Sequence, residues 1–198
     1  MSATKIRLST EEKELVMQSG WILTKNRVLK KVWDLLEEMQ AAQQDYMIHL
    51  PEEVRKVNAK ISKGENYQGL PWLILDQPRY FNKEHVFAIR ELFWWGNFFS
   101  STLQLSGNYK ARYEKKILDS LDRLKEQDFY LCVNTDPWEH HFEEGNFEAM
   151  REMSKDKMEE WIMRSGFIKL SRKIPLERWD SVDSELLEIF GIYVKLLA

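Results

Sequence analysis

The spacing of apolar residues predicts two helices at the N-terminal end of the chain. Ser9-Thr10-Glu11-Glu12 has the hydroxyl and Glu spacing of a capping box, so a short helix should begin there and end near Gly20. A long helix should follow, from roughly Thr24 to Met47, because apolar residues repeat there at steps of four and three. The residues of this stripe are Val28, Val32, Leu35, Met39, Ala42 and Tyr46.

The centre of the chain has the pattern of β-strands. Leu50–Gly69 is polar and is interpreted as a connector, and Trp72–Asp76 is a short apolar strand. Two longer strands are expected at His85–Trp95 and Phe98–Leu105. Gly96-Asn97 between them predicts a two-residue hairpin turn, because both residue types tolerate positive φ.

The rest of the chain alternates between helices and strands. We expect a helix at Lys110–Glu126, a strand at Phe129–Asn134 and a loop at Thr135–Gly145. A helix at Phe147–Arg164 and a strand at Phe167–Ile174 should follow, and the last helix should begin at Asp180 or Ser181. The order ααβββαβαβα favours the α+β class, with about five strands in a mixed or largely antiparallel sheet and helices packed on it. A length of 198 residues fits one globular domain, residues 1–198.

Composition narrows the classes of function. The net charge is −3, and the densest basic run, Lys25–Lys31, is followed at once by acidic residues, so nucleic-acid binding is not expected. No stretch reaches the roughly 18 apolar residues of a membrane span, and Met1–Thr10 lacks the apolar core of a signal peptide. The single cysteine, Cys132, lies in an apolar run and should be buried. We therefore expect a soluble, cytoplasmic protein with no membrane partner, no cofactor and no bound metal.

The expected hairpin has one face that suits a ligand. With a two-residue turn, Trp95 lies opposite Phe98, and large aromatic residues share a face with a few polar ones. The residues of this face are Phe87, Ile89, Glu91, Phe93, Trp95, Phe98, Ser100, Thr102 and Gln104. Aromatic walls with a few polar groups are typical of a small-ligand pocket. The alternatives are a half-solvated face and a face covered by another chain in a homo-oligomer.

Two arginines stand among apolar residues. Arg90 shares the other hairpin face, which should meet the helices, with Val86, Ala88, Leu92 and Trp94, and Arg172 shares a side with Ile168, Leu170 and Ile174. Two inward guanidinium groups could hold a carboxylate or phosphate between them. Alternatively, each pairs with an internal acid such as Asp76 or Glu91, because an unpaired buried charge is costly.

The loop Asp136–Glu144 holds the remaining candidates for chemistry, His140, His141 and Glu143. Adjacent histidines do not have metal-ligand spacing, and no third ligand is evident. An acid–base pair is one hypothesis, since histidine titrates near neutral pH, and an ordinary solvated loop is the other.

The sequence therefore favours a binding module for a small ligand. If the two arginines hold the ligand, it is an anion. Its expected ligand-binding residues are Arg90, Glu91, Phe93, Trp95, Thr102, Gln104 and Arg172. Two alternatives stay open. One is a structural or interaction protein that uses the aromatic face as a subunit contact, and the other is an acid–base or metal-dependent enzyme that uses the Asp136–Glu144 loop.

Overall fold

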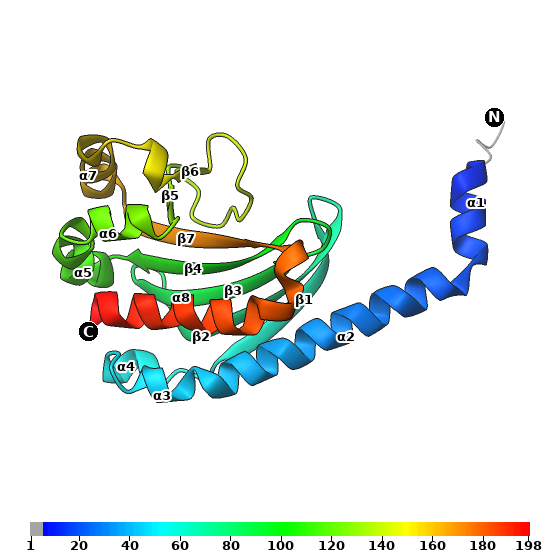
Figure 1. Cartoon of the computed structure of the whole chain (residues 1–198), viewed down its shortest axis with the longest axis horizontal. Coiled ribbons are helices and arrows are strands. Elements are labelled where there is room, and N and C mark those ends of the chain that lie inside the picture. The colour runs from blue at the N-terminus through cyan, green and yellow to red at the C-terminus, as the bar shows by residue number, and fades with distance from the viewer. Residues whose placement is uncertain (1–5) are drawn as a thin grey trace.

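A seven-stranded antiparallel sheet forms the centre of the structure, a computed structural model that describes residues 6–198 (Figure 1). The strand order is β1-β2-β3-β4-β7-β5-β6, and every neighbouring pair is antiparallel. The strands are β1 Lys60–Tyr67, β2 Leu70–Phe81, β3 Val86–Trp94, β4 Phe98–Ser106, β5 Tyr130–Cys132, β6 Phe147–Ala149 and β7 Phe167–Pro175. The predicted α+β class is confirmed, but the sheet has seven strands rather than about five.

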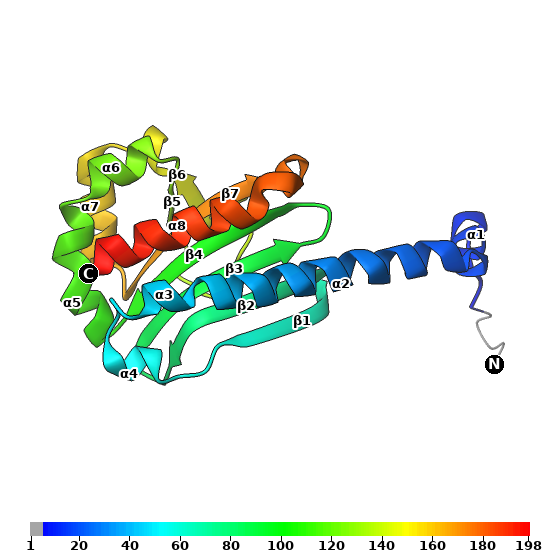
Figure 2. The ribbon, with the colours of Figure 1, turned by 60° about the horizontal axis from the view of Figure 1, so that its bottom comes forward.

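Helices cover one face of this sheet and one of its ends. Figure 2 shows α2 and α8 lying across one face, while α5, α6 and α7 gather at one end. The helices are α1 Thr10–Met17, α2 Ser19–Ala42, α3 Gln44–Met47, α4 Glu52–Arg55, α5 Asn108–Leu118, α6 Leu121–Glu126, α7 Lys155–Arg164 and α8 Val182–Leu197, with 3-10 turns at Met150–Glu152 and Leu176–Ser181. Among residues 6–198, none of these helices combines the length and apolar character needed to cross a bilayer.

The predicted capping box is confirmed at the start of α1. Ser9 Oγ accepts from the Glu12 backbone N–H at 3.1 Å, and Glu12 Oε2 accepts from the Ser9 N–H at 2.6 Å. The boundary with the next helix was predicted wrongly, because α2 begins at Ser19 and Gly20 lies inside it. A single glycine inside a helix lowers stability without ending the helix.

Two edge strands were not predicted. β1 lies in the expected connector, where its polar, largely exposed residues resemble those of a loop. A strand at the edge of a sheet pairs through its backbone on one side only, so its side chains need not be apolar. β6 occupies three residues of the expected helix Phe147–Arg164, and the helix itself begins later, at Lys155.

The connection between β3 and β4 has three residues, not two. Trp94 pairs with Phe98, so the predicted pair of Trp95 and Phe98 is wrong, and Gly96 lies inside the connection with φ of 72°. A register shift of one residue moves every side chain of a strand to the opposite face. Consequently the β4 side chains lie on the faces opposite to those predicted.

The face under α2 and α8 is the one that carries Glu91. Its buried residues from β3 and β4 are Phe87, Ile89, Glu91, Phe93, Phe99, Ser101, Leu103 and Leu105. The prediction that the Arg90 face meets the helices is therefore wrong. Both faces of β3 carry large apolar residues, so the alternation alone could not identify the face that the helices cover.

The Arg90 face is covered by the connection between β5 and β6, residues 133–146. Phe142 of this connection packs edge-to-face on Phe98, with ring centroids 5.0 Å apart, and joins a small apolar cluster with Ile74, Leu92 and Trp94. The chain thus uses a long loop, rather than a helix, as the second layer here. The candidate site lies under this loop.

Candidate functional site

Tyr67, at the end of β1, holds the loop against the sheet. Its hydroxyl accepts from the backbone N–H groups of His140, at 2.8 Å, and His141, at 3.2 Å. The same hydroxyl donates to Glu139 Oε2 at 2.9 Å. Burial raises the pKa of Tyr67 to about 12, so the hydroxyl keeps its proton and can make all three bonds.

Lys169 of β7 holds the loop from a second position. Its side chain is fully buried, and Nζ donates to the backbone oxygen of Pro137 at 2.9 Å and to that of Glu139. Burial lowers the pKa of this amine to about 8, which still leaves most of it protonated at neutral pH. Residues 137–141 are therefore held by Lys169 at the start of the segment and by Tyr67 at its end.

A cavity of about 400 Å³ lies between this segment and strands β1, β2 and β3. Its aromatic walls are Tyr67, Trp72 and Trp138, and Ile74 and Leu92 add aliphatic surface. Its polar side chains are Ser62, Asn66, Asp76, Arg90 and His140. Aromatic walls beside convergent polar side chains are common in small-molecule sites.

Asp76 and Arg90 form the polar floor of the cavity. They are directly opposite each other in the β2–β3 register. Arg90 donates from Nε to Asp76 Oδ1 at 2.8 Å and from Nη2 to Oδ2 at 3.2 Å, and Nη1 lies 3.0 Å from His140 Nε2. A guanidinium has five N–H groups. Two of them, one on Nη1 and one on Nη2, have no protein acceptor within residues 6–198.

His140 is neutral in this arrangement. Burial, and then the charge of Arg90, lower its pKa well below the usual value of 6.5. Because a guanidinium only donates, His140 Nε2 must accept, and the ring proton is then on Nδ1. The one lone pair of the neutral ring is therefore occupied, so His140 presents an N–H donor rather than a base.

The position of Trp72 depends on Gly64 of the edge strand. The two residues are paired in the β1–β2 register, and a Cβ built on Gly64 would lie 2.6 Å from atoms of the indole ring. Glycine inside a strand often marks such a close approach. Trp138, by contrast, is half exposed, at 50%, and its ring contacts Phe81 with centroids 5.9 Å apart.

The structure brings only part of the predicted ligand-binding set to this cavity. Arg90 lines it, whereas Thr102 shares its face but bonds to Ser171 Oγ at 2.8 Å. Gln104 is buried two positions further along β4. Glu91, Phe93 and Trp95 were expected to line the pocket, but they point to the helix side of the sheet.

Arg172 does not meet Arg90. Its position opposite Ser101 places it on the helix side, where Nη1 donates to Glu188 Oε1 of α8 at 3.2 Å. The structure therefore supports internal acid partners for both arginines, Asp76 for Arg90 and Glu188 for Arg172. It does not bring the two together as a clamp.

The three loop residues proposed for catalysis, His140, His141 and Glu143, do not form one group around Arg90. His141 lies between Glu139 and Glu143, with Nε2 to Oε2 at 3.7 Å and Nδ1 to Oε2 at 3.9 Å, and it does not share the Arg90 contact of His140. Among the described residues, no three His, Cys, Asp or Glu side chains converge as metal ligands. The sequence did not point to Tyr67, Trp138 or Lys169, because the pairing of β1 and the course of the loop bring them to the site.

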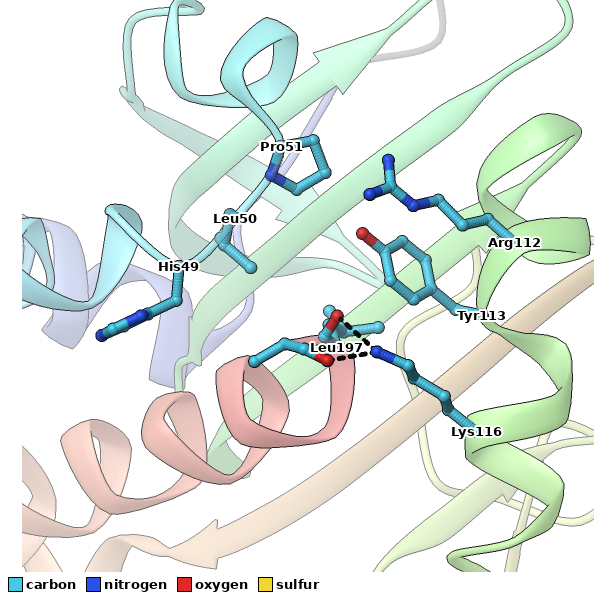
Figure 3. A pocket seen from close by; sticks show the side chains of 8 residues that line it. His49, Leu50, Pro51, Arg112, Tyr113, Lys116 and Leu197 are labelled. Carbon is cyan, nitrogen blue, oxygen red and sulfur yellow. Dashed lines mark hydrogen bonds between the residues drawn. The ribbon is translucent and has the colours of Figure 1, made fainter.

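A second cavity, of about 230 Å³, lies at the end of α8. Figure 3 shows Tyr113 and Lys116 of α5 facing Leu50, Pro51 and Leu197. Lys116 Nζ donates to the backbone oxygens of Leu197 and Ala198, so its charge is already engaged. This cavity lacks the group of aromatic walls seen under the loop.

Comparison of the chain with protein-family models, with curated proteins and with solved structures finds no match.

Proposed function

We propose that the cavity under the loop binds a small, flat organic molecule that carries a carboxylate or carbonyl group. The observation behind this proposal is Arg90, which lies at the floor of the cavity and has N–H groups with no acceptor in the described part of the chain. Asp76 holds the guanidinium in place from the opposite side. A guanidinium fixed in this way loses little freedom when a ligand acceptor binds to it.

The walls favour a flat, apolar body in the ligand. Trp72 and Trp138 provide large ring surfaces, and a bound ring would remove part of the half-exposed Trp138 from water. The volume, about 400 Å³, lies in the lower part of the range of about 300–1,000 Å³ that small-molecule sites occupy. The ligand is therefore small.

The floor favours an acceptor of low charge. Arg90 and His140 Nδ1 offer donors, so an acceptor on the ligand would complete their hydrogen bonds. Asp76 already balances the charge of Arg90, so a multiply charged phosphate gains little here. A carboxylate or a neutral carbonyl fits better than a phosphate.

The test is a titration with simple probes. Benzoate, indole-3-acetate and benzamide have the expected chemistry, and cyclohexanol lacks the flat ring and the carbonyl. Binding to the native state raises the melting temperature by mass action, and stacking on tryptophan changes its fluorescence. We expect both signals with at least one of the first three probes and neither with cyclohexanol.

Two variant pairs assign the signal to the cavity. Trp138→Ala should weaken binding at small cost in stability, because this side chain is half exposed, and Trp21→Ala, an exposed tryptophan elsewhere, should not. Arg90→Lys should weaken binding, while Arg172→Lys on the other face should leave it unchanged. Equal losses in both members of either pair, or no signal with any probe, would contradict the proposal.

A further inference from the structure

The N-terminal arm, residues 6–31, extends beyond the sheet and is joined to it by the ion pair of Lys25 with Glu65 of β1. Figures 1 and 2 both show α1 and the first half of α2 extending beyond the sheet. α1 has no buried residue, and the first buried residue of α2 is Val32. The arm therefore gains little stability from its own chain.

The exposed surface of the arm is strongly apolar. Of the large apolar side chains exposed in the described part of the chain, eight lie on the arm and only three elsewhere. Those of the arm are Ile6, Leu8, Leu15, Val16, Met17, Trp21, Ile22 and Leu23. At roughly 100 Å² each they expose about 800 Å², close to the ~800 Å² that each partner buries in a standard protein–protein interface.

The arm also forms one wall of a groove. Between the arm and the tip of the sheet lies a hollow of about 880 Å³, with Trp21 and Ile22 on one side and Leu70, Pro71 and Trp95 on the other. Large apolar side chains from another molecule would fill such a groove. An apolar surface of this extent typically marks an interaction site.

Charges identify the kind of partner. Acidic residues, Glu11 and Glu14, precede the exposed apolar residues that lie between Leu15 and Leu23, and basic residues, Arg27 and Lys31, follow them. None of these four has an ion-pair partner among residues 6–198. The start of α2 also lacks an acidic residue and a side-chain cap, so the positive end of its helix dipole is uncompensated.

We propose that the arm pairs, in antiparallel orientation, with the arm of a second copy of this chain. An antiparallel two-fold pairing places apolar segment on apolar segment and brings Glu11 and Glu14 of each copy toward Arg27 and Lys31 of the other. An anionic membrane surface fits less well, because it would repel the acidic first helix.

Sedimentation equilibrium of the full chain tests this directly. The parent chain should have twice its monomer mass at micromolar concentrations. Trp21→Glu should raise the dissociation constant roughly 30-fold or more, as expected for a central interface tryptophan. Met163→Glu, an exposed apolar residue on α7, is the matched control and should leave the dimer unchanged.

Charge reversal distinguishes a second copy from other occupants. Glu11→Lys with Glu14→Lys should weaken the dimer at low salt, and adding Arg27→Glu with Lys31→Glu in the same chain should restore it. A parent chain that stays monomeric overturns the proposal, and so does a monomer that binds phosphatidylserine vesicles through Trp21. A dimer that is insensitive to both Trp21→Glu and charge reversal overturns it as well.

Discussion

Glu91 gives the sharpest test of the energetics of this structure. Its carboxyl group is buried on the helix side of β3, where Oε1 accepts from Ser101 Oγ at 3.1 Å and from Gln43 Nε2 at 3.2 Å. Two atoms of this cluster, Glu91 Oε2 and Gln43 Oε1, have no hydrogen-bond partner among residues 6–198. A proton on Oε2 would turn it into a donor and allow an acid–amide pair with two hydrogen bonds.

The expected effect of pH follows from the pKa of this group. Burial raises the pKa of Glu91 from 4.5 to about 8, so the folded state holds a proton that the unfolded state loses. The stabilisation is therefore complete below pH 4.5 and is lost as the pH rises through 8. Each pH unit above 4.5 removes about 1.36 kcal/mol, so by pH 7 the free energy of unfolding has fallen by on the order of 3 kcal/mol.

Two other buried groups increase the free energy of unfolding as the pH rises, but they do so mainly below pH 6.5 or above pH 8. His140, whose pKa is lowered, increases stability as the pH rises toward 6.5, and Lys169, whose pKa is lowered to about 8, does so between 8 and 10.5. From pH 6.5 to 8 the slope is thus dominated by Glu91. Over that window the free energy of unfolding should fall by about 1–2 kcal/mol.

Urea denaturation of the parent chain and of Glu91→Gln at several pH values between 6.5 and 8 measures this effect. Glutamine keeps the shape and the hydrogen bonds of the protonated acid, so the variant should be more stable at pH 8 and should lose the slope. Glu177→Gln, which removes an exposed carboxylate, should keep the slope of the parent. A parent whose stability does not change over this window, or an equal slope in Glu91→Gln, would refute the reasoning.

Three further predictions concern the candidate site. Arg90→Met should lower the free energy of unfolding by about 3–5 kcal/mol in urea denaturation, because it leaves the buried Asp76 unpaired, and Asp76→Leu in the same chain should recover much of that loss. Gly64→Ala should displace the Trp72 indole and weaken probe binding more than it lowers the melting temperature, as fluorescence titration and thermal unfolding would show. Lys169→Met should free the loop carbonyls from their donor, so limited proteolysis should cut residues 133–146 faster than in the parent chain.

The sequence predicted the elements that carry a strong local signal. The capping box at Ser9, the hairpin strands and the apolar stripe of the long helix are all present, because periodic burial and local hydrogen bonds determine them. The edge strand β1 had no such signal. Its pairing with β2 is a long-range property of the sheet, so the place of Tyr67 beside the loop could not be inferred from nearby residues.

The error in the turn had the largest consequence for the site. Counting Gly96 and Asn97 as the whole connection placed Thr102 opposite Glu91, whereas the three-residue connection places it opposite Arg90. The sequence did indicate that Arg90 needs an acid, and it named Asp76 and Glu91 as candidates. Glu91 is excluded because consecutive residues of a strand point to opposite faces. Asp76 pairs with Arg90 only because the β2–β3 register places the two side chains directly across from each other. That register, rather than any motif, gives the cavity a rigid guanidinium at its floor.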